Sequence, residues 1–242
     1  MAARATLEPP AAGIVFLAVP DSVVGEIAAR MAAAHPAPAV AFVHLSGALG
    51  LDVLAPLRRH DLGSFHPLQS FPAPRPPVAF HGITIAVDAT APGLRRRLAA
   101  LARRLGAHPK TVAAADRAVY HAAGVFASNF LDVVVGEGVR MLEGIGWTEA
   151  EATKALLPLV DGAVENIRRR GVAGALTGPI RRGDAGTVAR HLQAIDNADL
   201  YRMLGTIALR IAKEAGLEPA AVGRVNRALT RKVAATRRRR RR

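Results

Sequence analysis

Strand-like apolar runs alternate with helix-like stretches over residues 12–110, and this alternation restricts the fold more than any other feature of the sequence. We expect strands at 13–19, 39–46, 62–68 and 82–88 and helices at 22–34, 49–59 and 92–106. Strands that are separated by helices predict a parallel sheet covered on both faces. The Pro-rich segment 71–80 is expected to be a surface loop.

After about residue 110 the strand-like runs end, and the pattern predicts helices only. One long helix is expected over 112–143, and Thr148 with Glu151 has the spacing of a capping box at the start of the next helix, which ends before Gly171. Asp184 is typical of a helix N-cap, and two further helices are expected over 198–215 and 218–235. The predicted fold class is therefore α/β followed by all-α, with domains at 1–110 and 111–236.

Composition and charge limit the partners and the compartment. The net charge is +14, but residues 237–242 are six consecutive arginines, which we expect to form a disordered tail that binds polyanions without sequence preference. The ten aromatic residues are not interleaved with basic pairs, so no specific nucleic-acid partner is expected. The absence of cysteine fits a reducing, cytoplasmic location. The apolar runs are shorter than the ~20 residues that a membrane span needs.

Polar residues follow three of the predicted strands at the point where each strand ends. Val19, Pro20 and Asp21 lie where the first strand ends, Ser46 and Gly47 where the second ends, and His66 and Gln69 where the third ends. Ligands bind at the carboxyl ends of strands in open α/β sheets, so these residues are expected to converge. Each also has a plain structural interpretation, with Ser46 as a helix cap and His66 as a partly buried histidine.

The predicted long helix adds short polar side chains in one narrow sector, namely His121, Ser128 and Asp132, with Asn129 at its edge. The opposite side is apolar and is expected to pack against the body through Val119, Phe126, Phe130 and Val133. The polar sector is either a solvated face or the wall of a cleft. The loop 175–184, which contains Thr177, is either a further part of the site or a connector between helices.

This set of residue types suits hydride-transfer chemistry. Reduction of a keto acid leaves an alkoxide that must be protonated, and a histidine or lysine performs this step at neutral pH. Neutral donors or a cation must also hold the substrate carboxylate in place. No HxH, HxxxH or paired-carboxylate spacing indicates a metal site. Ser46 lacks the GxSxG elbow of a serine hydrolase.

Six segments, spread in this order over most of the range 12–210, carry a resemblance to a known family: "FLAVPD", "HLSGALGLDVL", "GSFHPLQSF", "YHAAGVFASNF", "VENI" and "LTGPIRRGD". The chain resembles NADP-dependent oxidoreductases in which a Rossmann-like domain precedes a DUF2520 domain. Their layout is similar to the 6-phosphogluconate dehydrogenase-like superfamily, which includes ketopantoate, pyrroline-5-carboxylate and prephenate enzymes. The resemblance implies a partial Rossmann-like parallel sheet, NADP(H) beside Val19, Pro20 and Asp21, and a homodimer through the helical domain.

The resemblance also implies roles for individual residues. Ser46 and His66 look like the substrate-side Ser and His-Pro of prephenate dehydrogenases. His121 and Asn129 fall where ketopantoate and β-hydroxyacid enzymes carry a catalytic Lys and an Asn, although His replaces Lys here. We therefore expect His121, His66 and Asn129 to be catalytic, with the proton donor open between the two histidines. The predicted substrate-binding residues are Ser46, Gly47, Gln69, Ser128 and Thr177. Ketopantoate, a small 2-keto acid of pantothenate synthesis, is the substrate that the resemblance implies.

The sequence departs from this family at its beginning. A full member starts with a strand, a GxGxxG turn that cradles the pyrophosphate, and a helix, whereas residues 1–10 contain no glycine and Gly13 enters a strand. Either the sequence record is truncated or the chain does not hold NADP in the usual way. We favour truncation, or pairing with another chain, because an unpaired strand edge is unfavourable. The reductase is expected to be incomplete as written, and the alternative function is a non-catalytic dimerisation or partner-binding module.

Overall fold

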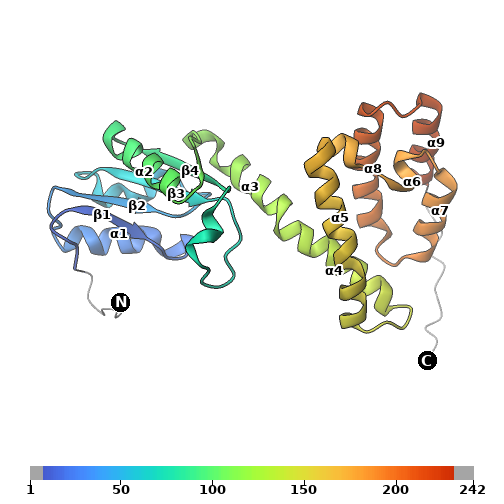
Figure 1. Cartoon of the computed structure of the whole chain (residues 1–242), viewed down its shortest axis with the longest axis horizontal. Helices are drawn as coiled ribbons and strands as arrows, with labels where there is room; N and C mark the ends of the chain where they lie inside the picture. The colour runs from blue at the N-terminus through green and yellow to red at the C-terminus, as the bar shows by residue number, and fades with distance from the viewer. Residues whose placement is uncertain (1–7, 232–242) are drawn as a thin grey trace. The chain divides into compact units, whose positions relative to one another are not determined.

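The computed structural model describes residues 8–231 (Figure 1). The described chain divides into two compact units, one up to Val133 and the other from Val134 onward. The domain boundary predicted near residue 110 remains a prediction. The arginine tail, residues 237–242, lies outside the described residues.

The first unit contains a five-stranded sheet in the spatial order β1 (Gly13–Leu17), β2 (Val40–His44), β3 (Leu62–Pro67), β4 (Thr84–Ala89) and β5 (His108–Lys110). The strands β1, β2 and β3 are parallel, which confirms the α/β prediction. β4 instead runs antiparallel to β3. The connection 68–83 contains only the short 3₁₀ turn η3 (Pro77–Phe80) and lacks the helix that usually forms the crossover between parallel strands. β5, parallel to β4, was not predicted, because its three residues carry no strand pattern.

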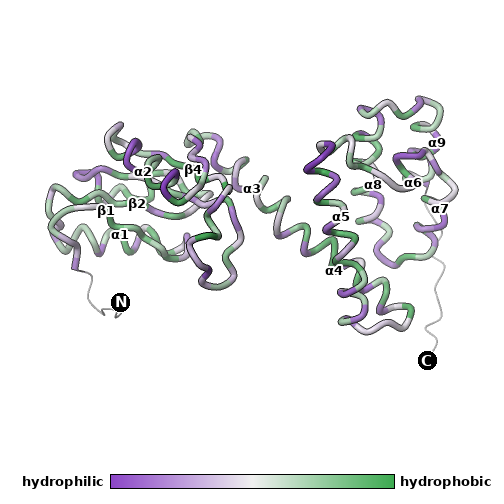
Figure 2. The backbone as a smooth tube through the Cα atoms, viewed as in Figure 1, coloured by the Kyte–Doolittle hydropathy of each residue, from purple (hydrophilic) through white to green (hydrophobic). Residues whose placement is uncertain are grey.

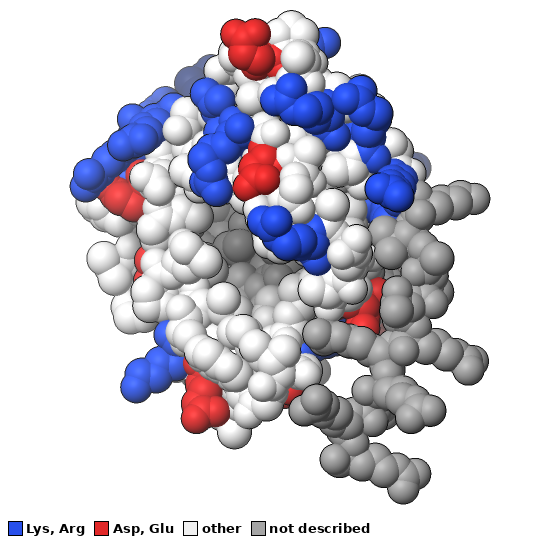
Figure 3. All heavy atoms as spheres, turned by 90° about the vertical axis from the view of Figure 1, so that its right-hand side faces the viewer, with Lys and Arg blue, Asp and Glu red and all other residues white. Residues whose placement is uncertain are grey.

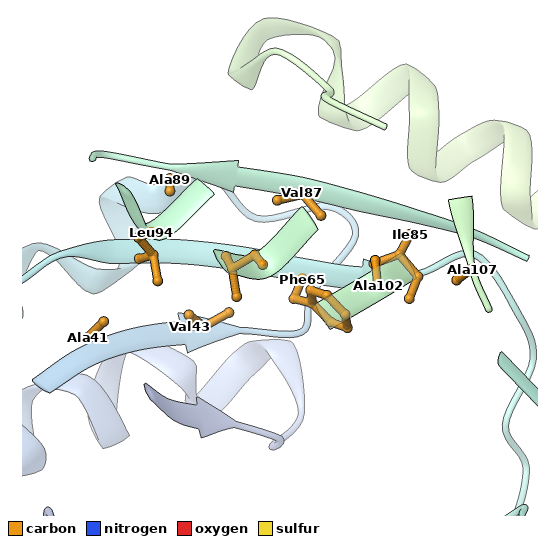
Figure 4. Close-up of a cluster of buried hydrophobic side chains, with 10 residues drawn as sticks. Ala41, Val43, Phe65, Ile85, Val87, Ala89, Leu94, Ala102 and Ala107 are labelled. Carbon is orange, nitrogen blue, oxygen red and sulfur yellow. The ribbon is translucent and has the colours of Figure 1, made fainter. Parts of the chain in front are cut away.

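Helical segments cover both faces of the sheet. The 3₁₀ turn η1 (Asp21–Val23), the helix α1 (Val24–Ala33) and the 3₁₀ segment η2 (Leu51–Leu57) lie on one face, where Phe42 and Leu54 are fully buried. On the other face α2 (Pro92–Arg104) packs its buried side against the sheet, as Figure 4 shows for Leu94 and Ala102. Since side chains alternate along a strand, Phe65 faces α2, while its neighbours Ser64 and His66 face the opposite side.

The prediction of a single long helix over 112–143 is wrong at one point. The structure has a 3₁₀ turn η4 (Ala114–Asp116), then α3 (Arg117–Ala127) and α4 (Asn129–Glu143), with Ser128 between them at φ −121° and ψ −77°. Ser128 and Asn129 are consecutive poor helix formers whose polar side chains compete for backbone hydrogen bonds, which is a physical reason for a break here.

The apolar side of α3 and α4 is exposed, contrary to the expectation that it packs against the body. Val119 is 74% exposed and Phe126 is 67% exposed, and both Phe130 and Val133 are also exposed. Figure 2 shows the hydrophobic character of this stretch. Residues 114–143 are long and apolar enough to cross a membrane by length and composition, although one such helix is weak evidence for a span. The absence of a membrane span therefore remains a prediction.

The second unit is helical, as predicted. It contains α5 (Glu149–Ala175), α6 (Gly178–Arg181), α7 (Ala185–Ala194), α8 (Ala198–Glu214) and α9 (Pro219–Thr230), and its core includes Val188 and Leu229. The capping box of Thr148 and Glu151 is confirmed, and Asp184 caps α7 through the Thr187 amide. The helix that begins at Glu149 ends before Gly171, as predicted, because Gly171 adopts the non-helical angles φ 68° and ψ 174°; a short second helical segment completes α5 up to Ala175.

Candidate active site

The loops after β1 and β2 are joined by the side chain of Ser46. Its hydroxyl donates to Asp21 Oδ2 at 2.6 Å and accepts from the backbone N–H groups of Ala48 and Leu49 at 3.1 and 3.0 Å. Because these bonds use the donor and both acceptor positions, Ser46 fixes the shape of the loop. Asp21 itself is exposed at the carboxyl edge of the sheet, next to Val19 and Pro20.

Two histidines meet over a glycine at this edge. A Cβ atom on Gly47 would lie 2.7 Å from Cε1 and 2.8 Å from Nε2 of His66, and 3.0 Å from Cδ2 of His121. The Nδ1 atom of His66 is 3.0 Å from the hydroxyl of Tyr120. The ring centroids of His66 and His121 are 6.3 Å apart. The loop after β2, the end of β3 and the first turns of α3 therefore converge on one point.

Arg117 fixes the start of α3 on the sheet. It is only 2% exposed, donates from Nη2 to the hydroxyl of Ser64, and lies 3.8 Å from the carboxylate of Asp88. Tyr120 and His121 follow Arg117 by three and four residues, so they lie on the same side of the helix one turn later. The anchored first turn thus places both rings over His66, which is two residues beyond Ser64 on the same face of the sheet.

Burial and nearby positive charge keep His66 and His44 neutral. Burial, followed by the charges of His121 and Arg117, lowers the pKa of His66 from 6.5 to about 4. Burial and Arg117 likewise lower the pKa of the fully buried His44, which pairs with Ser64 across the sheet, to about 4. Burial raises the pKa of Tyr120. At neutral pH Tyr120 therefore keeps its proton, and its hydroxyl shares a hydrogen bond with Nδ1 of the neutral His66, whose direction depends on the imidazole tautomer.

The other predicted residues lie apart from these rings. Gln69 is exposed, and its side-chain oxygen accepts from the N–H of Ser70. Ser128 and Asn129 lie at the break between α3 and α4, about two helical turns beyond His121. Among residues 8–231, no hydrogen bond or ring contact joins any of these three to His66. Their roles in a site remain predictions.

Thr177 belongs to the second unit. It lines a groove of about 700 Å³ together with Arg170, Arg181 and Arg182. Lys and Arg side chains gather at one end of the molecular face that Figure 3 shows, with few acidic groups among them. The role predicted for Thr177 in substrate binding remains a prediction.

Four residues of this region were not singled out from the sequence: His44, Ser64, Arg117 and Tyr120. His44 and Ser64 read as ordinary strand residues, and only the sheet register brings them beside each other. The spacing of Arg117 with Tyr120 and His121 at i, i+3 and i+4 was a usable signal for one helix face. In the described part of the chain, no group of three or more His, Asp or Glu side chains is arranged to hold a metal ion.

The sheet, the polar groups at its carboxyl edge and the helical second unit define a Rossmann-like domain followed by a helical domain. The sequence profile of the Rossmann-like domain matches residues 3–68, and that of "Domain of unknown function (DUF2520)" matches residues 83–208. The second match covers more than half of the chain, and the chain belongs to the DUF2520 family.

Solved structures share this fold. A protein from Thermotoga maritima has a TM-score of 0.70 at 22% identity, over 86% of this chain and 81% of that one. A candidate NADP oxidoreductase from Bacteroides fragilis has a TM-score of 0.69 at 22% identity, over 83% and 75%. Pyrroline carboxylate reductase from Plasmodium falciparum with NADP bound has a TM-score of 0.55 at 10% identity, over 88% and 77%. At these identities the likeness establishes the fold alone. No curated protein sequence matches the chain.

Proposed function

We propose that this protein is an NADP(H)-dependent reductase of a small 2-keto acid, with the reduction of ketopantoate to pantoate as the specific reaction. One observation carries the proposal: His66, Tyr120 and His121 meet over Gly47, at the edge of the sheet where ligands of this fold class bind. The fold likeness to a reductase with NADP bound supports the choice of cofactor.

The chain's own residues fit one end of the cofactor better than the other. The loop after β1, with Val19, Pro20 and Asp21, would lie beside the nicotinamide, and the bare backbone of Gly47 leaves room next to it. The sequence contains no GxGxxG turn for the pyrophosphate. Among residues 8–231, no strand pairs with the outer edge of β1. We propose that tight NADPH binding requires a strand–turn–helix unit with a GxGxxG turn at this edge of the sheet.

We propose that the two histidines divide the chemical work. NADPH, when bound, supplies the hydride. In the tautomer that carries its proton on Nε2, the neutral His66 is oriented by Tyr120, points Nε2 toward Gly47 and donates a hydrogen bond to the carbonyl oxygen of the substrate. His121 is exposed to solvent and donates a proton to the alkoxide that forms when the hydride is transferred. His121 is therefore the proposed proton donor of the two.

Replacing the histidines tests this assignment. We expect His121→Gln to lower kcat by about 10²–10⁴-fold, the usual contribution of a general acid. The dissociation constant for NADPH should stay unchanged in His121→Gln and in His66→Gln, because neither ring holds the pyrophosphate. Turnover is measured as NADPH oxidation at 340 nm with ketopantoate, and with pyrroline-5-carboxylate for comparison. The exposed His108 gives the matched control, His108→Gln. If His121→Gln and His66→Gln are as active as this control, the proposal is contradicted.

A second proposal concerns the oligomeric state. On α5 four apolar residues recur at intervals of three and four, and all are half-buried or exposed: Leu157, Val160, Val164 and Ile167. Such spacing forms a stripe that packs against another helix in coiled-coil fashion. We propose that the stripe packs against a second copy of the chain, which gives the homodimer expected through the helical domain. The same surface supports the alternative function of a dimerisation module.

Charges placed in the stripe are expected to separate the copies. The double change Val164→Glu and Ile167→Glu should convert a dimer into a monomer, measured by light scattering coupled to size-exclusion chromatography. Ala155→Glu serves as the control, because Ala155 is exposed on nearly the opposite side of α5. A wild-type monomer, or a dimer that persists in the double variant, would show that the stripe is not the interface.

A further inference from the structure

A second groove lies on the other face of the sheet, away from the histidines. It has a volume of about 320 Å³ and runs between α2 and the strand β5. Val87 lines the groove and belongs to the core under α2, whereas Ser64 and His66 face the opposite side of the sheet. This groove is therefore distinct from the candidate active site.

Four cations line this groove: Arg95, Arg96, Arg103 and Lys110. No acidic side chain lines it, and none of the four forms an ion pair within residues 8–231. Within the described part of the chain, Arg95 alone of the four has a hydrogen-bond partner, the backbone oxygen of Ala89 at 3.2 Å. Thr111 adds a hydroxyl beside Lys110. Four like charges in one groove repel each other, so the arrangement favours an anion.

The positions of the arginines follow from the geometry of α2. Residues 92, 95, 96, 99 and 103 fall on one side of the helix, next to the side that buries Leu94, Leu98 and Ala102. Arg97 and Arg104 point to the other flank and do not line the groove. From Arg95 to Arg103 the helix rises about 12 Å. The three arginines therefore form a row along α2, and Lys110 adds a fourth cation from β5.

We propose that this groove binds a small molecule that carries two or three linked phosphate groups. Arginine side chains bind phosphate oxygens bidentately, and a row of four cations matches the charge of a di- or triphosphate better than that of a single phosphate. None of the residues that line the groove is aromatic, so it offers no platform for stacking the bases of a nucleic acid strand. The proposal does not depend on the reductase activity.

Two double variants with equal charge provide the test. Arg96→Ala with Arg103→Ala removes two cations from the groove, and Arg97→Ala with Arg104→Ala removes two from the other flank of the same helix. The full chain is titrated with inorganic tripolyphosphate at 150 mM salt by calorimetry, and the amides of Ala99 and Thr111 are followed by NMR. We expect at least a tenfold weakening in the groove variant and less than a twofold change in the control.

Three results would overturn the proposal. The first is equal weakening in both variants, which indicates binding by general charge. The second is tripolyphosphate binding that leaves the Ala99 and Thr111 amide signals unmoved. The third is tighter binding of a 12-base-pair DNA duplex than of tripolyphosphate, with the same dependence on Arg96 and Arg103, which would indicate a nucleic-acid surface. Circular dichroism of each variant confirms that it is folded.

Discussion

Gly47→Ala should reduce turnover about 100-fold while leaving the chain folded. The new Cβ atom would lie within 3.0 Å of atoms in both His66 and His121, so the two rings must move apart. A displacement of about 1 Å at reacting groups costs about 10²-fold in rate. The cost in stability is expected to be about 1 kcal/mol, at the low end for overpacking, because His121 is exposed and free to shift.

Gly25 provides a matched control for this substitution. Gly25 lies inside α1 in the same unit, and a Cβ atom there meets nothing closer than 3.7 Å. Gly25→Ala is therefore expected to be neutral or to stabilise by up to about 1 kcal/mol, with unchanged turnover. The imidazole signals of His66 and His121 in NMR spectra report the displacement directly. If Gly47→Ala shifts both imidazole signals but leaves turnover unchanged, His66 and His121 take no part in the reaction.

The first unit should lose stability as the pH falls from 6.5 to 4. Folding lowers the pKa of His44 and His66 to about 4, so between these pH values the unfolded chain binds protons that the folded chain does not. The contribution of these two histidines to the free energy of unfolding is fully present above pH 6.5. It decreases as the pH falls, until both are protonated in the folded state. The loss amounts to about 3 kcal/mol for the fully buried His44 and less for the half-buried His66.

Hydrogen exchange of the β2 and β3 amides measures this loss in the unit where it arises. The only tryptophan, Trp147, lies in the other unit and would report on the wrong region. His66→Gln should weaken the dependence of amide protection on pH in part, and His44→Asn should weaken it further. His108→Gln, on an exposed residue, should leave it unchanged. If protection is the same at pH 7 and pH 4.5, the two histidines are not held neutral.

Much of the fold was predictable because its signals are local. The apolar runs located four of the five strands, and the cap residues Thr148 and Asp184 located two helix starts. The reversal of β4 was missed because strand direction depends on whether the connection forms a crossover helix, which the Pro-rich segment 71–80 does not. The break at Ser128 was missed because the apolar periodicity of 112–143 continues across it.

The candidate site was predictable in part. Strand-end positions placed Asp21, Gly47 and His66 at one edge, and the helix pattern contributed His121. The buried support beneath them was not predictable, since the contact of Arg117 with Ser64 spans 53 residues and depends on the completed sheet. The sequence does not distinguish Arg117 from the other basic residues of a chain that has 33 lysines and arginines.

The central claim is that the His66–Tyr120–His121 cluster reduces a keto acid with NADPH. The most direct measurement incubates the protein with ketopantoate and NADPH that carries deuterium at the transferred position, and analyses the product by mass spectrometry. The proposed function predicts pantoate with one deuterium at C2, in an amount that falls about 100-fold in Gly47→Ala and remains unchanged in Gly25→Ala. Bound NADPH without any deuterated product, from ketopantoate or other small 2-keto acids, would contradict it.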